Sequence, residues 1–589
     1  MSGSIFEAST AIEQVVGNLK ICLSRRDFPN LAFKCKCLIS RYDNPLVVAY
    51  SEELDDEELI RLVLTIFQET DDSQIVSHLG DVIFILARRP KNLRKIVESN
   101  TLGILMEKFA KQDPSRVNFV TQILAIIITL LEYEDIRELA ADAKIIESIL
   151  PKLNNFIPDK KFIVNCLKIF NLLTSSEMLL ERLFTSGAIP EIVRAMNNYG
   201  AEAEVCFEGC SVLNVMLDQP QAQQFLLENS ITPVFARILN KHATDSKVPL
   251  PLCHALRKLI PFRRVRIEAD QTTIAADLIR TITKHQTGNL TIVQYAFMTL
   301  VIMSTSAECR DNCRKACVDQ CIVNCIERYS YNSAVVRDGC VALAALIYNN
   351  DLIERFEATG MAKSLNKAVK TLGDEDHKTT LRVLASAYKE ASMNEKCIPS
   401  LVQHNSATSL LSLLNYQYSD KTIVALCLTA LAKISANPGS HDQFERANAA
   451  LVIPTVMSRF MEKNWMIVRS CALIMKNLSQ SPRWKVLLAS KGGYKQVLRA
   501  MVYYLKNCKA IILACLETIH QISSQEKVQS ALKDERVMKA LNVIEQRFHR
   551  KSRTIATLAT ESMNFISTKE VYSPDEESLL LPPLPAVEE

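Results

Sequence analysis

The sequence predicts an all-α solenoid, in which helical units are stacked one on the next. The first observation is a recurrence: with few exceptions, a small or thiol side chain returns every 42 to 45 residues along almost the whole 589-residue chain. The second is composition, since 14 Gly and 20 Pro are too few for a hairpin-rich β protein or a long disordered chain. A period in the forties indicates stacked helical units. We call the recurring sites the anchor positions: Cys37, Gly80, Ile123, Cys166, Cys210, Cys253, Ala296, Cys340, Ala385, Cys427, Cys471, Cys515 and Ala559.

Composition places the chain among soluble, well-packed proteins. Hydrophobic residues make up 48% and charged residues 23%, and the net charge of +4 is too small for a general polyanion binder. Met1–Thr10 lacks the basic start and apolar core of a secretory signal. The most apolar run, Phe119–Leu131, is shorter than the roughly 20 residues that cross a bilayer, so we interpret it as a buried helix.

The 18 cysteines indicate a reducing compartment and free thiols. Equivalent residues of stacked helices lie roughly 10 Å apart, beyond the Cα separation that a disulfide tolerates. We therefore expect a cytoplasmic protein. Association with the cytoskeleton or a cilium, and entry into the nucleus, stay open.

The clearest unit runs from Asn464 to Asn507. Ile467–Ser479 places apolar residues at steps of three and four, as a helix with one buried face requires. Ser481-Pro482 interrupts it, Trp484–Ser490 gives a short second helix, and Gly492-Gly493 marks a sharp corner before the helix Tyr494–Leu505. The same order recurs in other parts of the chain: 162–174, 177–186 and 187–193; 336–348, 353–359 and 361–369; 423–435, 447 and 452–456.

These units resemble the armadillo-repeat family. The phrase Gly187-Ala188-Ile189-Pro190-Glu191-Ile192-Val193 and the segment Val468–Ser479 carry the likeness, which covers roughly residues 20 to 565 in phase. HEAT repeats are the neighbouring alternative for the first units and for 240–300. The resemblance implies a right-handed α-solenoid of about 12–13 three-helix repeats. It also implies a concave groove, lined by the long helices, that holds extended partner segments.

The anchor position faces the interior of such a stack, where the family typically places alanine. Cysteine is compact, mildly apolar and often buried, so we interpret the thiol anchors as slightly enlarged alanines. The structural anchors predicted on this basis are Cys166, Cys210, Cys340, Cys427, Cys471 and Cys515.

A second cysteine group occurs at uniform four-residue steps: Cys309, Cys313, Cys317, Cys321 and Cys325. The repeat phase divides it between two helices, with a corner near Cys317-Val318. Packing is one interpretation, a redox-sensitive or lipidated face is another, and a metal site is a third whose spacing fits zinc poorly. No metal or other cofactor is expected.

The groove prediction rests on five residues. Arg337, Arg382 and Arg469 come two to three residues before their anchors, where the family's groove face begins, and they form a basic strip that suits acidic partner segments or holds surface salt bridges. Lys433 and Asn477 occupy the position at which importin-α-like members place the asparagine that clamps a peptide backbone. Only Asn477 matches that pattern clearly, so a nuclear-import receptor is disfavoured.

We predict three regions. Residues 1–19 form an N-terminal cap helix or tail, and 20–566 form the solenoid, with 241–250 as the candidate for a softer junction. Residues 567–589 form an acidic tail containing Leu581-Pro582-Pro583-Leu584-Pro585, which favours polyproline II. That tail is either frayed, a motif for an SH3- or WW-type domain, or a segment that folds back on the protein's own groove.

No nucleotide-binding loop, nucleophile elbow or metalloprotease motif is present, so no enzymatic activity is expected. Basic clusters at 88–95, 263–266 and 547–553 lack interleaved aromatics, which disfavours nucleic acid. The predicted function is a scaffold or adaptor that binds extended or helical protein segments. The alternatives are a regulator of a small GTPase, motor or ciliary complex, and a redox- or metal-responsive protein that uses the cysteines between 309 and 325.

Overall fold

A computed structural model describes residues 17–27, 29–34, 57–87, 90–112, 116–140, 144–155, 159–348, 352–373, 377–525, 528–529 and 532–566. The described residues form helices and no strand, as predicted. The chain divides into two compact units, Met1–Lys284 and His285–Glu589. The anchor Cys37 and the tail 567–589 lie outside the described residues.

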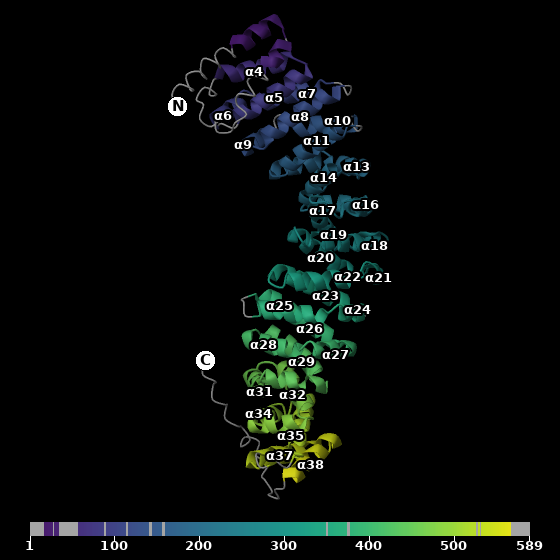
Figure 1. The fold of residues 1–589 in the computed structure, drawn as a ribbon, viewed down its shortest axis with the longest axis vertical. Helices are drawn as coiled ribbons and strands as arrows, with labels where there is room; N and C mark the ends of the chain where they lie inside the picture. The colour runs from purple at the N-terminus through teal and green to yellow at the C-terminus, as the bar shows by residue number, and fades with distance from the viewer. Residues whose placement is uncertain are drawn as a thin grey trace. The chain divides into compact units, whose positions relative to one another are not determined.

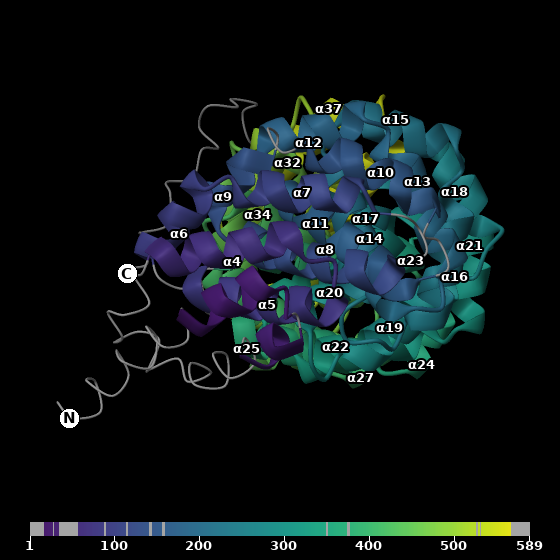
Figure 2. The ribbon, with the colours of Figure 1, turned by 90° about the horizontal axis from the view of Figure 1, so that it is seen from above.

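In the first unit, each anchor from Gly80 to Cys253 lies on what we call a ladder helix, and the ladder helices of successive repeats within the unit pack against each other (Figures 1 and 2). The ladder helices are α5 (Ser73–Ala87), α8 (Val117–Leu131), α11 (Lys160–Leu173), α14 (Ala203–Met216) and α17 (Pro249–Leu259). The middle helices are α4 (Glu57–Glu69), α7 (Thr101–Ala110), α10 (Ile145–Asn155), α13 (Ala188–Asn198), α16 (Thr232–His242) and α19 (Ile274–His285). The short helices are α6 (Pro90–Glu98), α9 (Glu134–Arg137) with η3 (Glu138–Ala140), α12 (Glu177–Thr185), α15 (Pro220–Glu228) and α18 (Arg263–Asp270).

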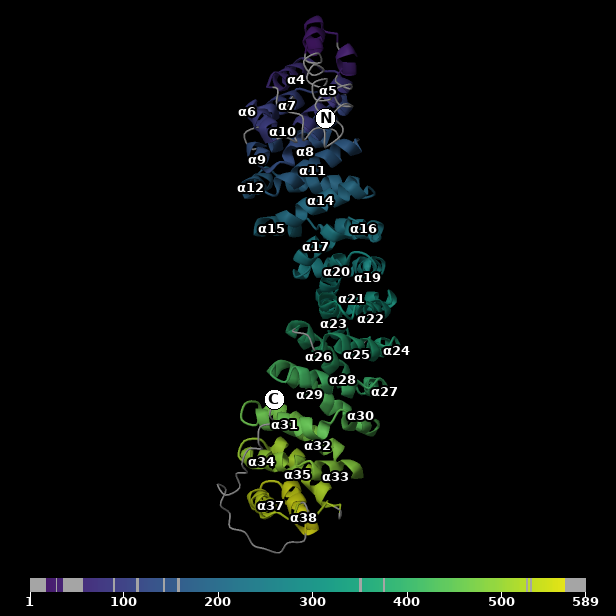
Figure 3. The same ribbon diagram turned by 60° about the vertical axis from the view of Figure 1, so that its left-hand side comes forward.

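The second unit repeats this arrangement, and Figure 3 shows its ladder helices α29, α32, α35 and α38 stacked in chain order. The ladder helices are α20 (Leu290–Met303), α23 (Ser333–Ile347), α26 (Lys378–Met393), α29 (Lys421–Ile434), α32 (Trp465–Leu478), α35 (Lys509–Ser523) and α38 (Arg553–Ile566). The middle helices are α22 (Val318–Arg328), α25 (Met361–Leu372), α28 (Ser406–Tyr416), α31 (Ala449–Phe460), α34 (Gly493–Tyr503) and α37 (Glu535–Phe548). The short helices are α21 (Ala307–Lys315), α24 (Ile353–Ala358), η4 (Glu395–Cys397) with α27 (Ile398–Gln403), η5 (Pro438–Ser440) with α30 (His441–Arg446), and α33 (Pro482–Ser490).

Every described anchor is buried, and the thiol anchors from Cys166 to Cys515 have no exposed surface. Burial raises the pKa of the Cys253 thiol to about 12, so this side chain stays a neutral thiol at physiological pH. No disulfide joins the described cysteines. A Cβ added to the anchor Gly80 would lie 2.5 Å from Cγ1 of Ile126, because a bulky residue of α8 fills the space. The described anchors are therefore interior residues of the stack.

The corner between the short and middle helices recurs with the repeat. Gly187, Gly360 and Gly492 adopt the left-handed conformation there, with φ between 74° and 88°. At the same corner of other repeats, six described residues take this conformation without being glycine: Asn100, Lys144, Ser230, Cys317, Asn405 and Asn448. The backbone geometry of the repeat therefore imposes this conformation even where the side chain disfavours it.

The short helices also cap the ladder helices that precede them. Nε of Arg137 donates to the carbonyl oxygen of Leu131 at 2.6 Å, and Nη1 of Arg310 donates to that of Ser304 at 2.9 Å. In each case a cation satisfies carbonyl groups that a helix leaves without partners at its C-terminal end.

The 241–250 segment joins α16 to α17, and its turn is held by Asp245, whose Oδ1 accepts hydrogen bonds from the backbone N–H groups of Lys247 and Val248. The boundary of the two compact units lies farther along, between Lys284 and His285. A softer junction at 241–250 stays a prediction.

Candidate partner-binding surface

The candidate partner-binding surface is formed by the outward side chains of α23, α26, α29, α32 and α35, and we call it the ladder surface. All five predicted groove residues project from these helices, and none of them is fully buried. Some of these five side chains already form ion pairs or hydrogen bonds within the protein, and others do not.

Arg337 and Arg382 are engaged in ion pairs. Nε of Arg337 donates to Oδ1 of its chain neighbour Asp338 at 2.8 Å, and that bond raises the pKa of the guanidinium. Nη2 of Arg382 on α26 donates to Oδ2 of Asp420 at 2.8 Å. Both arginines therefore satisfy buried carboxylates, which supports the salt-bridge interpretation at these two positions.

Asp420 also caps α29. Its Oδ1 accepts hydrogen bonds from the backbone N–H groups of Thr422 and Ile423 at 2.9 and 3.1 Å. Burial opposes ionisation, but the Arg382 guanidinium and these N–H groups outweigh it and lower the pKa of the Asp420 carboxyl. The Arg382–Asp420 pair thus links two successive repeats.

Asn477 does not present a free amide. Its Nδ2 donates to the carbonyl oxygen of Ala432 at 3.1 Å and to Oγ of Ser435 at 3.0 Å, both on or next to α29. The side chain therefore joins α32 to the preceding ladder helix. A peptide clamp of the kind suggested by its position would have to break these bonds.

Lys433 and Arg469 are exposed, and neither forms an ion pair with another described residue. Lys433 lies in the last turn of α29 and Arg469 in the second turn of α32. Because α29 and α32 pack side by side, the two cations lie at opposite ends of one shared patch, offset by about 12 Å along the helix axes. Of the five predicted groove residues, they are the two cations that no described carboxylate neutralises.

The structure adds residues that the sequence argument missed. Leu426 and Leu473 are half-buried on the same patch, and Nζ of Lys476 pairs with Oε2 of Glu517 at 2.5 Å beside it. Tyr348 and Met393, eight residues after their anchors, are exposed at the other end of the ladder surface. The anchor period could have located these positions, because each follows from a fixed offset.

The cysteine group divides as the repeat phase predicted, with Cys309 and Cys313 on α21 and Cys321 and Cys325 on α22. These four thiols are buried, and the Sγ atoms of Cys309 and Cys313 lie 3.9 Å apart. Contact with Cys321, followed by burial, raises the pKa of the Cys325 thiol. Only Cys317, at the corner, is exposed among the five.

Within the described part of the chain, no group of three or more His, Cys, Asp or Glu is arranged to hold a metal ion. In the same part, no single helix is long and apolar enough to cross a membrane, and one pair of helices bent by 120°, Lys421–Ile434 and Pro438–Arg446, meets such a test by length and composition alone. The apolar run at 119–131 forms the buried helix α8, as interpreted from the sequence.

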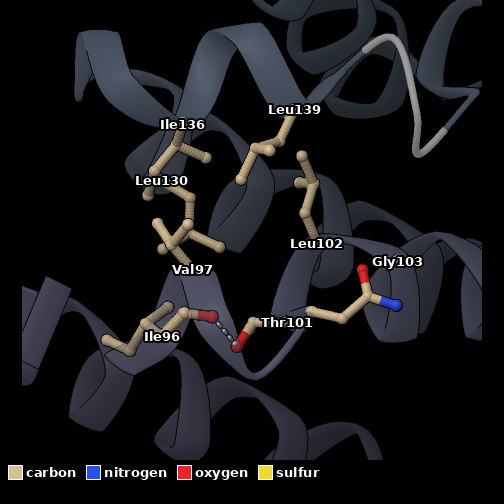
Figure 4. Close-up of a pocket in the computed structure, with 9 residues that line it drawn as sticks. Ile96, Val97, Thr101, Leu102, Gly103, Leu130, Ile136 and Leu139 are labelled. Atoms are coloured by element: carbon tan, nitrogen blue, oxygen red, sulfur yellow. Dashed lines mark hydrogen bonds between the residues drawn. The ribbon is translucent and has the colours of Figure 1, made fainter. Parts of the chain in front are cut away.

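Two cavities lie in the first unit, away from the predicted groove residues. One, of about 290 Å³, is lined by Leu102, Leu130, Ile136 and Leu139 beside the corner before α7 (Figure 4). Oγ1 of Thr101 donates to the carbonyl oxygen of Ile96 at 2.8 Å, so this hydroxyl is already engaged. The other, of about 250 Å³, lies between α13 and α16 beside Arg237 and Lys241. Neither contains a cluster of groups suited to catalysis.

Solved structures share this architecture. One, from work on a conserved phosphorylation switch that controls the interaction between cadherin and β-catenin, matches with a TM-score of 0.58 at 11% identity, over 84% of this chain and 96% of that one. An engineered protein matches with a TM-score of 0.52 at 16% identity, over 72% of this chain and 99% of that one. No family model and no curated protein matches the sequence. By fold, the described part of the chain is an all-α solenoid similar to these helical-repeat structures.

Proposed function

We propose that the chain is a non-catalytic scaffold that binds acidic protein segments on the ladder surface of the second unit, at α29 and α32. The observation that carries the proposal is the pair Lys433 and Arg469, which are exposed and not paired with any described carboxylate. The half-buried Leu426 and Leu473 beside them supply apolar area. An extended segment with carboxylates a few residues apart matches this pattern of two cations around a shallow apolar strip.

The fold favours a binding role because similar solenoids present long continuous surfaces. The solved structure related to cadherin and β-catenin is an example of this fold in the context of a protein interaction. A cytoplasmic location is part of the proposal, and the free thiols support it. No specific observation favours regulation of a GTPase, a motor or a ciliary complex over a general scaffold.

The test uses a fluorescent twelve-residue peptide of alternating Glu and Leu as the probe, with binding followed by anisotropy. Reversing both cations, Lys433→Glu with Arg469→Glu, should weaken binding about tenfold, which corresponds to about 1.4 kcal/mol from two exposed charge contacts. The matched control reverses Lys491 and Lys495, two exposed lysines at the corner before and within α34.

Equal affinity of the wild-type chain and the Lys433/Arg469 variant would overturn the assignment of the patch. An equal loss in the control variant would show that the peptide responds to net charge alone. Affinity purification from cells with the same two variants would then identify which natural partners depend on the patch.

A further inference from the structure

A second surface of the second unit combines exposed apolar side chains with cations. It lies at the corners where the middle helices α28, α31, α34 and α37 turn into the ladder helices α29, α32, α35 and α38. Figure 1 shows these four middle helices stacked along one side of the unit. We call this surface the basic–aromatic edge, and its members are Tyr416, Tyr418, Lys463, Trp465, Met466, Tyr503, Lys506, Lys509, Arg550, Lys551 and Arg553.

The corners that form the edge are adjacent in space. The Arg459 guanidinium of α31 lies over the ring of Tyr418 at 4.6 Å, which joins the first corner to the second. The Tyr504 hydroxyl donates to the carbonyl oxygen of Met461 at 2.6 Å, which joins the second corner to the third. α34 packs against α37, which carries the fourth. The edge is therefore one continuous strip.

Bulky side chains on this strip are more exposed to solvent than is usual for such residues in a monomeric protein. The side chains of Tyr416, Tyr418, Trp465, Met466 and Tyr503 are between 44% and 59% exposed. A contiguous set of such residues flanked by charges marks an interaction site.

The charged side chains on the strip are mostly positive. Corner segments 461–466, 503–509 and 549–553 contain six lysines and arginines and one carboxylate, Glu462. The cations Lys509, Arg550, Lys551 and Arg553 form no ion pair with another described residue. At the first corner, Asp420 is already buried and paired with Arg382. The occupant must therefore be acidic as well as apolar.

One segment of the same chain has this composition. Residues 567–589, which lie outside the described residues, contain six carboxylates and one lysine. The carboxylates Asp575, Glu576 and Glu577 come first, and Leu579–Leu581 and Leu584 follow them.

The order and spacing of these groups match the edge. The ladder helix α38 has 14 residues, so its C-terminal end at Ile566 lies about 21 Å from the corner that precedes it. Residues 567–573, if extended, span about 24 Å and would bring Asp575–Glu577 to the cations of 549–553. The next two corners lie about 10 and 20 Å farther along. Leu580 and Leu584 lie about 13 and 27 Å beyond Glu576 in an extended chain.

We propose that the acidic segment 570–585 docks on the basic–aromatic edge of its own chain, with its carboxylates on Arg550, Lys551 and Arg553 and its leucines on Tyr503 and Trp465. The docked segment covers exposed apolar surface and neutralises the positive charges of the corner between α37 and α38. This site adjoins the ladder-surface patch on α32, where Arg469 follows Trp465 by one turn, but its cations Arg550, Lys551 and Arg553 are not part of that patch. The two proposals are tested with different residues and different probes, so either can fail alone.

The chain has two tryptophans, and this makes the test direct. Trp484 is buried, whereas Trp465 lies on the edge and is half-exposed, so acrylamide quenching reports on Trp465. In the full chain, neutralising the tail by D575N/E576Q/E577Q should raise the quenching constant about twofold, because the covered half of the indole becomes accessible. The edge variant R550E/K551E/R553E should give the same increase.

Combining R550E/K551E/R553E with D575K/E576K/E577K should restore protection, since the charge pairing is reversed and not removed. The variant K491E/K495E is the matched surface control and should leave quenching unchanged, and W465F removes the signal. Circular dichroism confirms that each variant is folded. Protection that is independent of protein concentration assigns the contact to a single chain.

Equal quenching in the full chain and in the neutralised-tail variant would overturn the proposal. Protection of Trp465 that arises only with phosphatidylserine vesicles would overturn it too, and would assign the edge to an anionic lipid surface. Protection that depends on protein concentration would replace it with docking between two copies.

Discussion

Both units contain the same corner between middle and ladder helices, but the charged residues at this corner differ between them. In the first unit the corners contain Asp71, Asp159 and Glu202, and cations of neighbouring repeats meet two of them: Lys108 pairs with Asp71 at 3.3 Å and Lys160 with Glu202 at 2.6 Å. In the second unit the corners from α31 to α38 contain cations that form few internal pairs.

Apolar exposure follows the same division. From α4 onward, the exposed large apolar side chains among the described residues of the first unit are Met178 and Ile267, which lie on the short helices α12 and α18. In the second unit Tyr418, Trp465 and Tyr503 are exposed at or next to the corners. The comparison teaches that the buried anchors set the repeat, while the corner residues, which the packing leaves free to vary, decide what each unit presents to other molecules.

The largest expected effect tests whether the interior is equivalent in both units. Cys210→Arg in the first unit and Cys471→Arg in the second each place a cation at a site with no exposed surface, which should cost more than about 4 kcal/mol. The alanine variants should cost about 1 kcal/mol each. Urea unfolding followed by circular dichroism measures all four, and an arginine tolerated in either unit would contradict the shared role of the anchors.

The next effect compares two aspartates that cap helix N-termini, one that also forms an ion pair with an arginine and one that does not. Asp420→Ala removes the cap of α29 and leaves Arg382 without its partner, so we expect a loss of about 2 kcal/mol. Asp159→Ala in the first unit removes a cap on the backbone N–H of Phe162 and should cost about 1 kcal/mol. Similar losses would indicate that the Arg382 pair adds nothing.

The same residue gives a pH dependence with a defined sign. Because folding lowers the pKa of Asp420, its contribution is present above the unfolded value of about 3.9 and is lost as the pH falls through the folded value. The stability difference between the wild-type chain and Asp420→Asn should therefore shrink as the pH falls below about 3.9. A difference that is constant with pH would contradict the ionised pair.

A smaller effect is expected at the glycine anchor of the first unit. Gly80→Ala should destabilise by about 1 kcal/mol, since the strain of the Cβ against Ile126 exceeds the gain in helix propensity. Adding Ile126→Val should recover part of the loss, because it removes the δ carbon that lies 2.8 Å from the added atom. Thermal unfolding of the single and double variants distinguishes strain from a general effect.

The smallest effect concerns the left-handed corner. Cys317→Gly should stabilise the second unit by about 0.5 kcal/mol, because glycine adopts φ near 58° without strain, and Ser230→Gly should act similarly in the first unit. Gly360→Ala, the reverse change, should destabilise by about 1 kcal/mol. A destabilising Cys317→Gly would show that its 3.6 Å contact with Nη2 of Arg355 outweighs the backbone strain.

The helical class, the repeat and the interior residues could be predicted from the order of the amino acids. Residues such as Cys210 and Cys471 recur at a fixed interval because each successive helix must pack at the same distance. This requirement limits the size and polarity of the side chain at each anchor, so it can be recognised in the sequence. The corner at Gly187 could be predicted for the same reason, since its backbone angles depend on one residue.

Which surface residues are free of internal ion pairs could be seen only in the folded structure. Arg382 and Arg469 occupy similar places in the sequence pattern, yet Asp420, 38 residues beyond Arg382, binds the first, and no described carboxylate meets the second. Asn477 matched a peptide-clamp position, but its amide bonds to α29. Pairing of this kind depends on which side chain the next repeat brings within about 3 Å, and a periodic pattern carries no information on that distance.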